Sequence, residues 1–269
     1  MKKIMTIAAM LAAVMVSFSS CKKDEKPQGG GNTVVTCPDC GQPEDDCTCN
    51  DYVQAITIDG NFDDWAAVTP AVATCNPDAK YTALTTLKAY MDEFYVFLYV
   101  EFDEDEIVDR AWTPFHVYMN ADNSDATGGF GDQWTDANAE FMFETAIFGS
   151  DAFTTWDAAL FKWWGEVGGS GWLWTEGSVE GFDYADGDGL NWGAMLPEGS
   201  GITMGAGNGN AFEISILKEM VLGAEFAETI SVGVDIQQSW SSVGILPNAA
   251  VTDDNTNGLA PKLVVNLAK

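Results

Sequence analysis

The sequence contains 269 residues, of which 41 are acidic and 12 are basic, so the formal net charge is −29 at pH 7 and the isoelectric point is about 4.1. Nucleic acid is excluded as a partner, because the few basic residues are scattered and Arg110 is the only arginine. Hydrophobic residues make up 46% of the chain and aromatic residues 12%, which is typical of a folded protein and not of a disordered acidic one.

Residues 1–20 are predicted to be a lipoprotein signal peptide. Lys2 and Lys3 precede the apolar run 4–16, and small serines follow it. The run is thirteen residues long, shorter than the roughly twenty that a transmembrane helix needs. The next segment, Phe18–Cys21, resembles the processing site of bacterial lipoproteins. This resemblance implies cleavage before Cys21 and lipid attachment to that residue, with plain secretion as the alternative.

The segment after Cys21 indicates where in the cell the protein is expected. Lys22–Lys26 resembles the charged export tag of Bacteroidetes surface lipoproteins, which implies a lipid-anchored protein of the outer membrane, exposed on the cell surface. Residues 27–33, with three consecutive glycines, form a flexible spacer by composition. Removal of Met1–Ser20 takes away two lysines and no acids, so the mature net charge is −31. Such a charge repels anionic ligands and favours neutral glycans and divalent cations.

Four cysteines, in the pattern C-x2-C-x6-C-x-C, follow the spacer: Cys37, Cys40, Cys47 and Cys49. A segment this short has no hydrophobic core, so disulfides or a metal must hold it. We favour two disulfides, because exported proteins meet oxidising enzymes and C-x-C is an unusual half of a zinc ribbon. A structural Zn²⁺ is the alternative, and free thiols are the third. Residues 21–51 are therefore expected to be a lipid-anchored flexible tether with a Cys-rich knot.

Residues 52–269 are predicted to form one all-β domain with one or two short helices. Short β-prone runs alternate with turns rich in Gly, Asp and Asn, which is typical of an antiparallel β-sandwich. The run 94–102 is almost continuously apolar and predicts a strand buried on both faces. Only residues 63–68 and 215–222 have helical character. Further strands are expected at residues 52–58, 80–92, 115–119, 140–148, 153–159, 160–167, 172–179, 211–216, 230–237 and 262–267.

Several segments of this domain resemble family-nine carbohydrate-binding modules, and they occur in the family's order. These modules begin with a strand, an Asp-Gly turn and an Asp-x-Trp sequence, which residues 56–65 also contain. The resemblance covers most of residues 53–269 and implies a jelly-roll-like β-sandwich that binds carbohydrate without catalysis. The stretch 148–209 departs from the family, since it is longer and richer in tryptophan than the family core needs. The similar segments are residues 56–65, 90–100, 120–129, 139–141 and 212–216.

The turn 120–129 is a candidate site for structural Ca²⁺. Four side chains offer oxygen ligands within six residues, and two glycines allow the backbone to fold back, an arrangement that Ca²⁺ prefers. The turn is not an EF-hand, because its flanks are predicted strands and no glutamate stands at the twelfth position. The alternative is an Asx-rich turn whose carboxylates cap their own backbone. The candidate ligands are Asn120, Asp122, Asn123 and Asp125.

Tryptophan is concentrated in one part of the chain, since eight of the ten lie between residues 112 and 192. A hairpin across residues 168–171 places Trp163, Trp172 and Trp174 on one face and Trp164 on the other. The shared face is either buried, which is the default, or an open platform on which sugar rings stack. The carbohydrate-binding candidates are Trp134, Trp163, Trp164, Trp172, Trp174, Trp192 and Trp240.

Different roles are expected for Trp240 and Trp65. Trp240 follows the run 235–239, whose Asp and Gln side chains can hydrogen-bond sugar hydroxyls. Trp65 is expected to be a structural plug beneath the first turn.

Catalysis has less support in the sequence than binding. His116 is the only histidine and lies in a β-prone run, where a structural imidazole is expected instead of a general base. The sequence has no nucleophile elbow, HExxH helix or Gly-rich phosphate loop. We therefore predict a non-enzymatic surface lipoprotein that binds neutral carbohydrate and assists outer-membrane uptake proteins in glycan capture. A structural or protein-interaction lipoprotein without a glycan site is the alternative, and a glycoside hydrolase with an acidic pair ranks third.

Overall fold

The computed structural model describes residues 53–107, 113–147, 159–163, 203–218 and 226–268, and the residue pairs 186–187, 190–191 and 194–195. The chain divides into two units, Met1–Gln54 and Ala55–Lys269, and the fold described below belongs to the second. Within the described ranges, no helix is long and apolar enough to cross a bilayer. The predicted signal peptide, the lipidation site Cys21 and the cysteines Cys37, Cys40, Cys47 and Cys49 lie outside these ranges.

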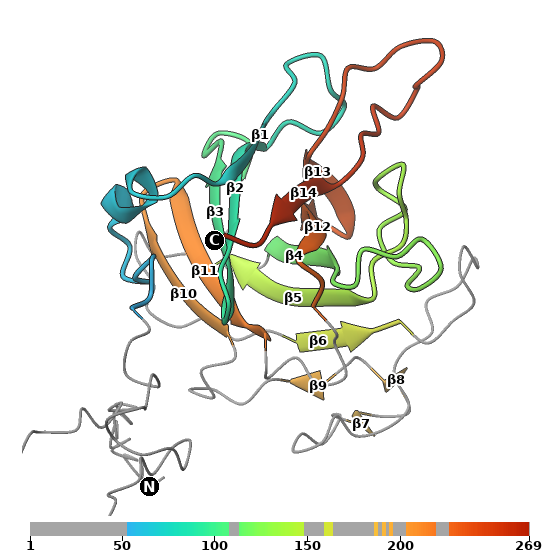
Figure 1. Cartoon of the computed structure of the whole chain (residues 1–269). Coiled ribbons are helices and arrows are strands. Elements are labelled where there is room, and N and C mark those ends of the chain that lie inside the picture. Colours follow the sequence, from blue (N-terminus) through green and yellow to red (C-terminus); the bar gives the residue numbers. More distant parts are fainter. Residues whose placement is uncertain are drawn as a thin grey trace, which may run out of the picture. The chain divides into compact units, whose positions relative to one another are not determined.

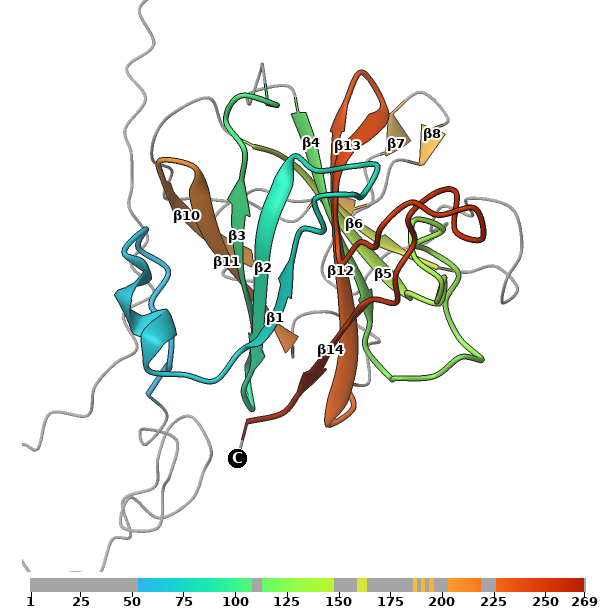
Figure 2. The same ribbon diagram turned by 90° about the horizontal axis from the view of Figure 1, so that it is seen from above.

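Two antiparallel sheets form the domain (Figure 1). In Figure 2, strands β10, β11, β3 and β2 lie on one side and strands β12, β4, β5 and β6 on the other. A 3-10 turn, Phe62–Ala66, overlaps the helix that was expected at 63–68. The predicted all-β antiparallel sandwich is therefore confirmed.

The strands of the two sheets are as follows. The first sheet has the order β1 (Ala71–Thr74), β2 (Leu84–Met91), β3 (Tyr95–Phe102), β11 (Ala211–Leu217) and β10 (Thr203–Asn208). The second has the order β13 (Ser241–Leu246), β12 (Thr229–Gln238), β4 (Thr113–Asn120), β5 (Phe141–Ile147), β6 (Ala159–Lys162) and β9 (Ala194–Met195), and β14 (Leu263–Asn266) also pairs with β12. Two short strands, β7 (Asp186–Gly187) and β8 (Leu190–Asn191), pair with each other.

The main core lies between the two sheets. An edge-to-face contact between Phe115 on β4 and Phe212 on β11, with ring centroids 5.0 Å apart, joins them. Side chains alternate along each strand, so Phe115 and Val117 belong to this core, whereas Tyr118 belongs to a second cluster on the opposite face of the sheet. We call that opposite face of the second sheet its outer face. Strand β3 contributes to clusters on both of its sides, which confirms the two-sided burial predicted for 94–102.

Some predicted elements differ from the structure. No strand forms at residues 53–58, where the N–H of Thr57 instead donates to the Asp64 carboxylate at 2.6 Å. The predicted helix 215–222 is wrong over Ser215–Leu217, because these residues continue β11 and pair with Tyr95–Phe97 of β3. Strands β1, β7, β8, β9, β10 and β13 were not predicted. Residues 153–158 and 164–167 of two predicted strands, and all of the predicted strand 172–179, lie outside the described residues.

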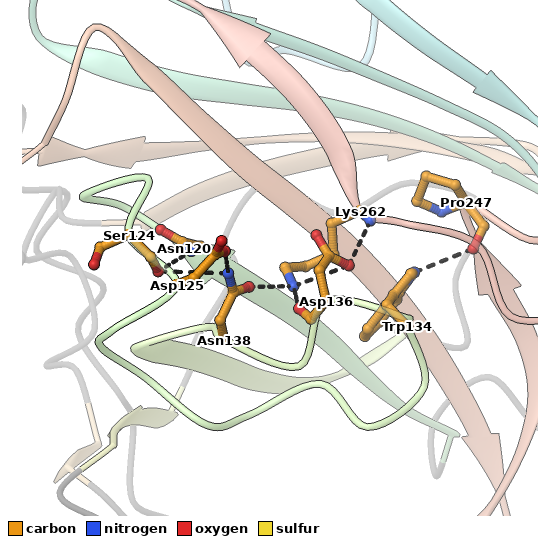
Figure 3. Close-up of polar contacts among 8 residues, drawn as sticks. All are labelled: Asn120, Ser124, Asp125, Trp134, Asp136, Asn138, Pro247 and Lys262. Atoms are coloured by element: carbon orange, nitrogen blue, oxygen red, sulfur yellow. Dashed lines mark hydrogen bonds and ion pairs between the residues drawn. The ribbon is translucent and has the colours of Figure 1, made fainter. Parts of the chain in front are cut away.

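The loop 121–140 between β4 and β5 covers part of the outer face. Trp134 packs against Gly233 of β12, where a Cβ atom would come within 2.5 Å of the indole ring. The Trp134 Nε1–H donates to the backbone oxygen of Pro247 at 3.1 Å (Figure 3). Trp163 packs against Gly129 in the same way, and a Cβ atom there would overlap its ring. Two glycines therefore make room for two large side chains.

Glu213 on β11 organises the first turn of the domain. Its carboxylate accepts hydrogen bonds from the backbone N–H groups of Asp59 and Gly60, each at 3.0 Å, and from Trp65 Nε1 at 2.8 Å. Burial raises the pKa of Glu213, although these three hydrogen bonds act in the opposite direction. Gly60 has φ of +79°, which glycine adopts without strain. Trp65 is buried, so its predicted role as a structural plug is confirmed.

Candidate functional site

The β12–β13 hairpin ends in an exposed tryptophan. Gln238 and Ser241 pair directly with each other, so Ser239 and Trp240 alone form the turn. Trp240 is 76% exposed, and in the described part of the chain no other aromatic side chain is exposed. The turn therefore presents one indole to solvent.

Both turn residues adopt a backbone conformation that L-amino acids rarely adopt. The φ angle is 50° at Ser239 and 64° at Trp240, as in a type I′ turn, for which Asn-Gly is a preferred pair. A bulky residue in this region is an outlier, and strain of this kind costs about 1–3 kcal/mol. Strained residues often cluster at ligand sites, and a bulky side chain in this conformation does not favour the stability of the turn.

Polar groups from two other segments stand beside this turn. Gln238, the residue before the turn, donates from Nε2 to the backbone oxygen of Glu106 at 2.9 Å. The Glu106 carboxylate accepts from the Thr82 hydroxyl at 3.2 Å. Amides and carboxylates next to an aromatic ring are the groups that recognise sugar hydroxyls. The sequence analysis predicted Trp240 as a candidate and named the polar residues that precede it on β12. It did not predict Glu106, which is 134 residues earlier in the chain.

The structure corrects the assignment of Trp134 and Trp163 as carbohydrate-binding residues. They are only 2% and 8% exposed and belong to the same outer-face cluster as Tyr118 and Phe161. Their ring faces are occupied by protein, so no sugar can stack on them. The remaining tryptophan candidates lie outside the described residues: Trp164, Trp172, Trp174 and Trp192.

The acidic turn after β4 is held by hydrogen bonds within the loop (Figure 3). The Nδ2 group of Asn120 donates to the backbone oxygen of Ser124 at 2.9 Å. Asp122 Oδ1 accepts from the Ser124 N–H at 2.9 Å, and Asp125 Oδ1 accepts from Asn138 Nδ2 at 2.9 Å. These bonds are those of an Asx-rich turn. They do not test whether Ca²⁺ binds, which stays a prediction.

Asp122 has a carboxylate neighbour that the sequence analysis missed. The hydroxyl of Thr127 lies 2.9 Å from both Asp122 oxygens and 2.7 Å from Glu140 Oε1. Burial, together with the nearby Asp122 carboxylate, raises the pKa of Glu140 to about 7. A cation between the carboxylates of Asp122 and Glu140 would reduce the electrostatic repulsion between them, as protonation of Glu140 does. Of the predicted ligands, Asp122 is therefore the best placed for Ca²⁺, whereas Asn123 is exposed.

A buried lysine ties the loop 121–140 to the segment before β14 (Figure 3). Lys262 Nζ donates to Asn138 Oδ1 at 2.9 Å and to the backbone oxygen of Asp136, and it lies 3.4 Å from Asp136 Oδ1. Burial lowers the pKa of Lys262, while the Asp136 carboxylate acts in the opposite direction. This ammonium group fixes the acidic loop on the sheet.

Three charged side chains lie side by side across the outer face, and we call them the polar row. Asp235 on β12 and Glu144 on β5 are the two cross-strand partners of His116 on β4. His116 Nε2 lies 2.8 Å from Glu144 Oε2, and Nδ1 lies 3.7 Å from Asp235 Oδ2. Burial alone lowers the pKa of His116, but the two carboxylates outweigh it and raise the pKa to about 9. The two carboxylates therefore favour the protonated imidazole.

A small cavity and the acidic side chains of the described part have fewer groups that could bind a ligand. A cavity of about 250 Å³ opens between β1 and β14, but Tyr90 is its single aromatic side chain and no charged side chain lines it. In the described ranges, no three His, Cys, Asp or Glu side chains gather in a way that could hold a metal ion. A Ca²⁺ ion at the acidic turn would therefore need neutral oxygen ligands beside Asp122 and Glu140.

Comparisons with protein families, curated proteins and solved structures found no match for this chain. The class of protein is therefore defined by its own features. Its described residues form an all-β sandwich in which Trp240 is exposed in a strained hairpin turn and a charged row crosses one sheet face.

Proposed function

We propose that this protein is a lipid-anchored outer-membrane protein that binds neutral carbohydrate at the cell surface and does not transform it. The observation that carries the proposal is Trp240, an exposed indole in a strained two-residue turn. Sugar rings present C–H groups that can stack on such a ring. The mature net charge of −31 disfavours acidic glycans. The anchor and the location rest on the sequence resemblances of Phe18–Cys21 and Lys22–Lys26.

Two structural elements belong to the same proposal. A Ca²⁺ ion at the acidic turn would neutralise Asp122 and Glu140, whose shared contact with Thr127 supports it. Two disulfides would close the four-cysteine segment 37–49. Neither element is expected to touch the carbohydrate.

Affinity electrophoresis of the mature chain in gels that contain neutral polysaccharides tests the proposal. Trp240→Ala is the test variant, and Val264→Ala, which truncates an exposed side chain on β14, is the matched control. We expect at least one neutral polysaccharide to retard the wild type and the control, and Trp240→Ala to migrate as in an empty gel. If no neutral polysaccharide retards the wild type, carbohydrate binding is contradicted. An interface role would then be favoured, since tryptophan is also a typical anchor of protein interfaces.

A further inference from the structure

A buried lysine faces a buried asparagine where the loop 121–140 meets the segment before β14 (Figure 3). The side chain of Lys262 has no exposed surface, and Asn138 is only 9% exposed. Lys262 Nζ lies 2.9 Å from Asn138 Oδ1, although the two residues are 124 positions apart in the chain. Lysine is seldom fully buried. The contact therefore brings an amine and an acyl group together away from water.

The side-chain amide of Asn138 is held with its oxygen toward the amine. Its Nδ2 donates to Asp125 Oδ1 at 2.9 Å and lies 3.4 Å from the backbone oxygen of Ser124. Because two acceptors face the nitrogen, the oxygen is the atom that faces Lys262. The hydrogen bond from Nζ polarises this carbonyl group, as donors do in acyl transfer. The amide is therefore oriented for attack at its carbonyl carbon, Cγ.

Backbone hydrogen bonds fix both residues in place. The N–H of Lys262 donates to Asp136 Oδ1 at 2.9 Å, and the N–H of Asn138 donates to the backbone oxygen of Asp136 at 2.8 Å. A third bond, from the N–H of Thr135 to the backbone oxygen of Ala260 at 3.0 Å, joins the two segments. Groups held in this way reach effective molarities of about 10⁵–10⁸ M in intramolecular reactions. An amide that is unreactive in solution can therefore react here.

Asp136 is placed to act as the base. An ammonium group has no lone pair, so Lys262 must lose a proton before it can attack. Asp136 Oδ1 lies 3.4 Å from Nζ, and its side chain is 28% exposed, so it can accept this proton and exchange it with water. Burial lowers the pKa of Lys262, although the Asp136 carboxylate acts in the opposite direction. The neutral amine is therefore within reach.

We propose that Lys262 and Asn138 form an intramolecular isopeptide bond, with Asp136 as the base. Nζ bonds to Cγ of Asn138, the bond between Cγ and Nδ2 breaks, and Nδ2 leaves as an ammonium ion that takes up the two protons lost by Nζ. One ammonium group and one primary amide thus become one secondary amide and one ammonium ion, so atoms and charge balance without a co-reactant. The bond would tie the loop 121–140 covalently to the last strand, β14, and it does not depend on the proposed function.

Peptide mapping of the folded mature chain by mass spectrometry tests the bond. Trypsin cuts after lysine and arginine but not after an acylated lysine. The bonded chain therefore gives residues 111–162 joined to residues 219–269, lighter than the two peptides together by one ammonia molecule. A chain without the bond gives three separate peptides, 111–162, 219–262 and 263–269. We expect the joined product from the wild type, with fragmentation placing the link at Lys262 and Asn138.

Two variants assign the roles. Lys262→Met removes the amine and keeps a flexible apolar side chain, and Asp136→Asn removes the base. We expect separate peptides from both. Asp132→Asn removes an exposed carboxylate from the same loop and is the matched control, which should give the joined product. Circular dichroism shows which variants are folded, and the wild type decides the question even where a variant does not fold.

Two results would overturn parts of the inference separately. Separate peptides from the folded wild type would show that the bond does not form, and that the contact between Lys262 and Asn138 is a hydrogen bond only. A joined product from Asp136→Asn in the yield of the wild type would leave the bond in place but overturn the role of Asp136. Neither result changes the proposal of carbohydrate binding at Trp240.

Discussion

The indole N–H of Trp65 donates to the carboxylate of Glu213 at 2.8 Å, across 148 residues of sequence. The same carboxylate accepts from the backbone N–H groups of Asp59 and Gly60. The Asp-Gly turn and the tryptophan that follows it are therefore fastened to one buried acceptor on β11.

Replacing Glu213 tests this arrangement. Glu213→Ala leaves the buried Trp65 N–H without an acceptor and removes the acceptor of two part-buried backbone N–H groups. Because a buried unpaired group costs about 1–3 kcal/mol, we expect the free energy of unfolding to fall by about 2 kcal/mol or more. Glu213→Gln keeps one acceptor oxygen and should cost less. Urea denaturation measures both variants, and a loss below about 1 kcal/mol for Glu213→Ala would show that the turn does not depend on this acceptor.

The pKa of Glu140 predicts how stability changes with pH. Its folded pKa of about 7 lies above its ordinary value of 4.5, so between these values the folded state keeps a proton that the unfolded state has released. Stability is therefore highest below about pH 4.5 with respect to this group, falls as pH rises to 7, and is constant above it. Glu140→Gln should remove this fall. Urea midpoints between pH 4 and 8 test it, and parallel curves for wild type and variant would disprove it.

The thermal stability of the protein with and without Ca²⁺ tests the predicted calcium site. Above pH 7 the Glu140 carboxylate is charged, so a bound Ca²⁺ should raise the thermal midpoint of the wild type. Glu140→Gln should reduce this increase. Thermal unfolding in CaCl₂ is compared with unfolding in EDTA, and MgCl₂ at equal ionic strength is the control. Equal midpoints in all three solutions would refute a calcium site at this turn.

The hairpin turn should be more stable with residues that suit its backbone. The double substitution Ser239→Asn with Trp240→Gly introduces the pair preferred in type I′ turns, so we expect the free energy of unfolding to rise by about 1–2 kcal/mol. The same variant should lose carbohydrate binding. A stability below that of the wild type would mean that Trp240 contributes to folding, contrary to the interpretation of its strain.

The sequence predicted those features that depend on local pattern. The apolar run 94–102 predicted strand β3, and the spacing of the first turn predicted the buried Trp65. Trp240 was a candidate because polar residues precede it on β12. The two-residue turn itself was not anticipated, since the strand β13 behind it has a weak β pattern.

The errors arose from contacts between distant segments. Trp134 lies in a polar stretch, but Gly233 leaves room for its ring on the sheet, 99 residues later in the chain. Glu140 is a partner of Asp122 only because Thr127 bridges them. Spacing within the turn 120–129 cannot indicate such partners.

Isothermal titration of the mature chain with a neutral oligosaccharide tests the central claim about Trp240 most directly. We predict that Trp240→Ala binds at least tenfold more weakly than the wild type, equivalent to about 1.4 kcal/mol, and that Trp240→Phe, which keeps an aromatic ring, lies between them. An unchanged dissociation constant for Trp240→Ala would contradict the account.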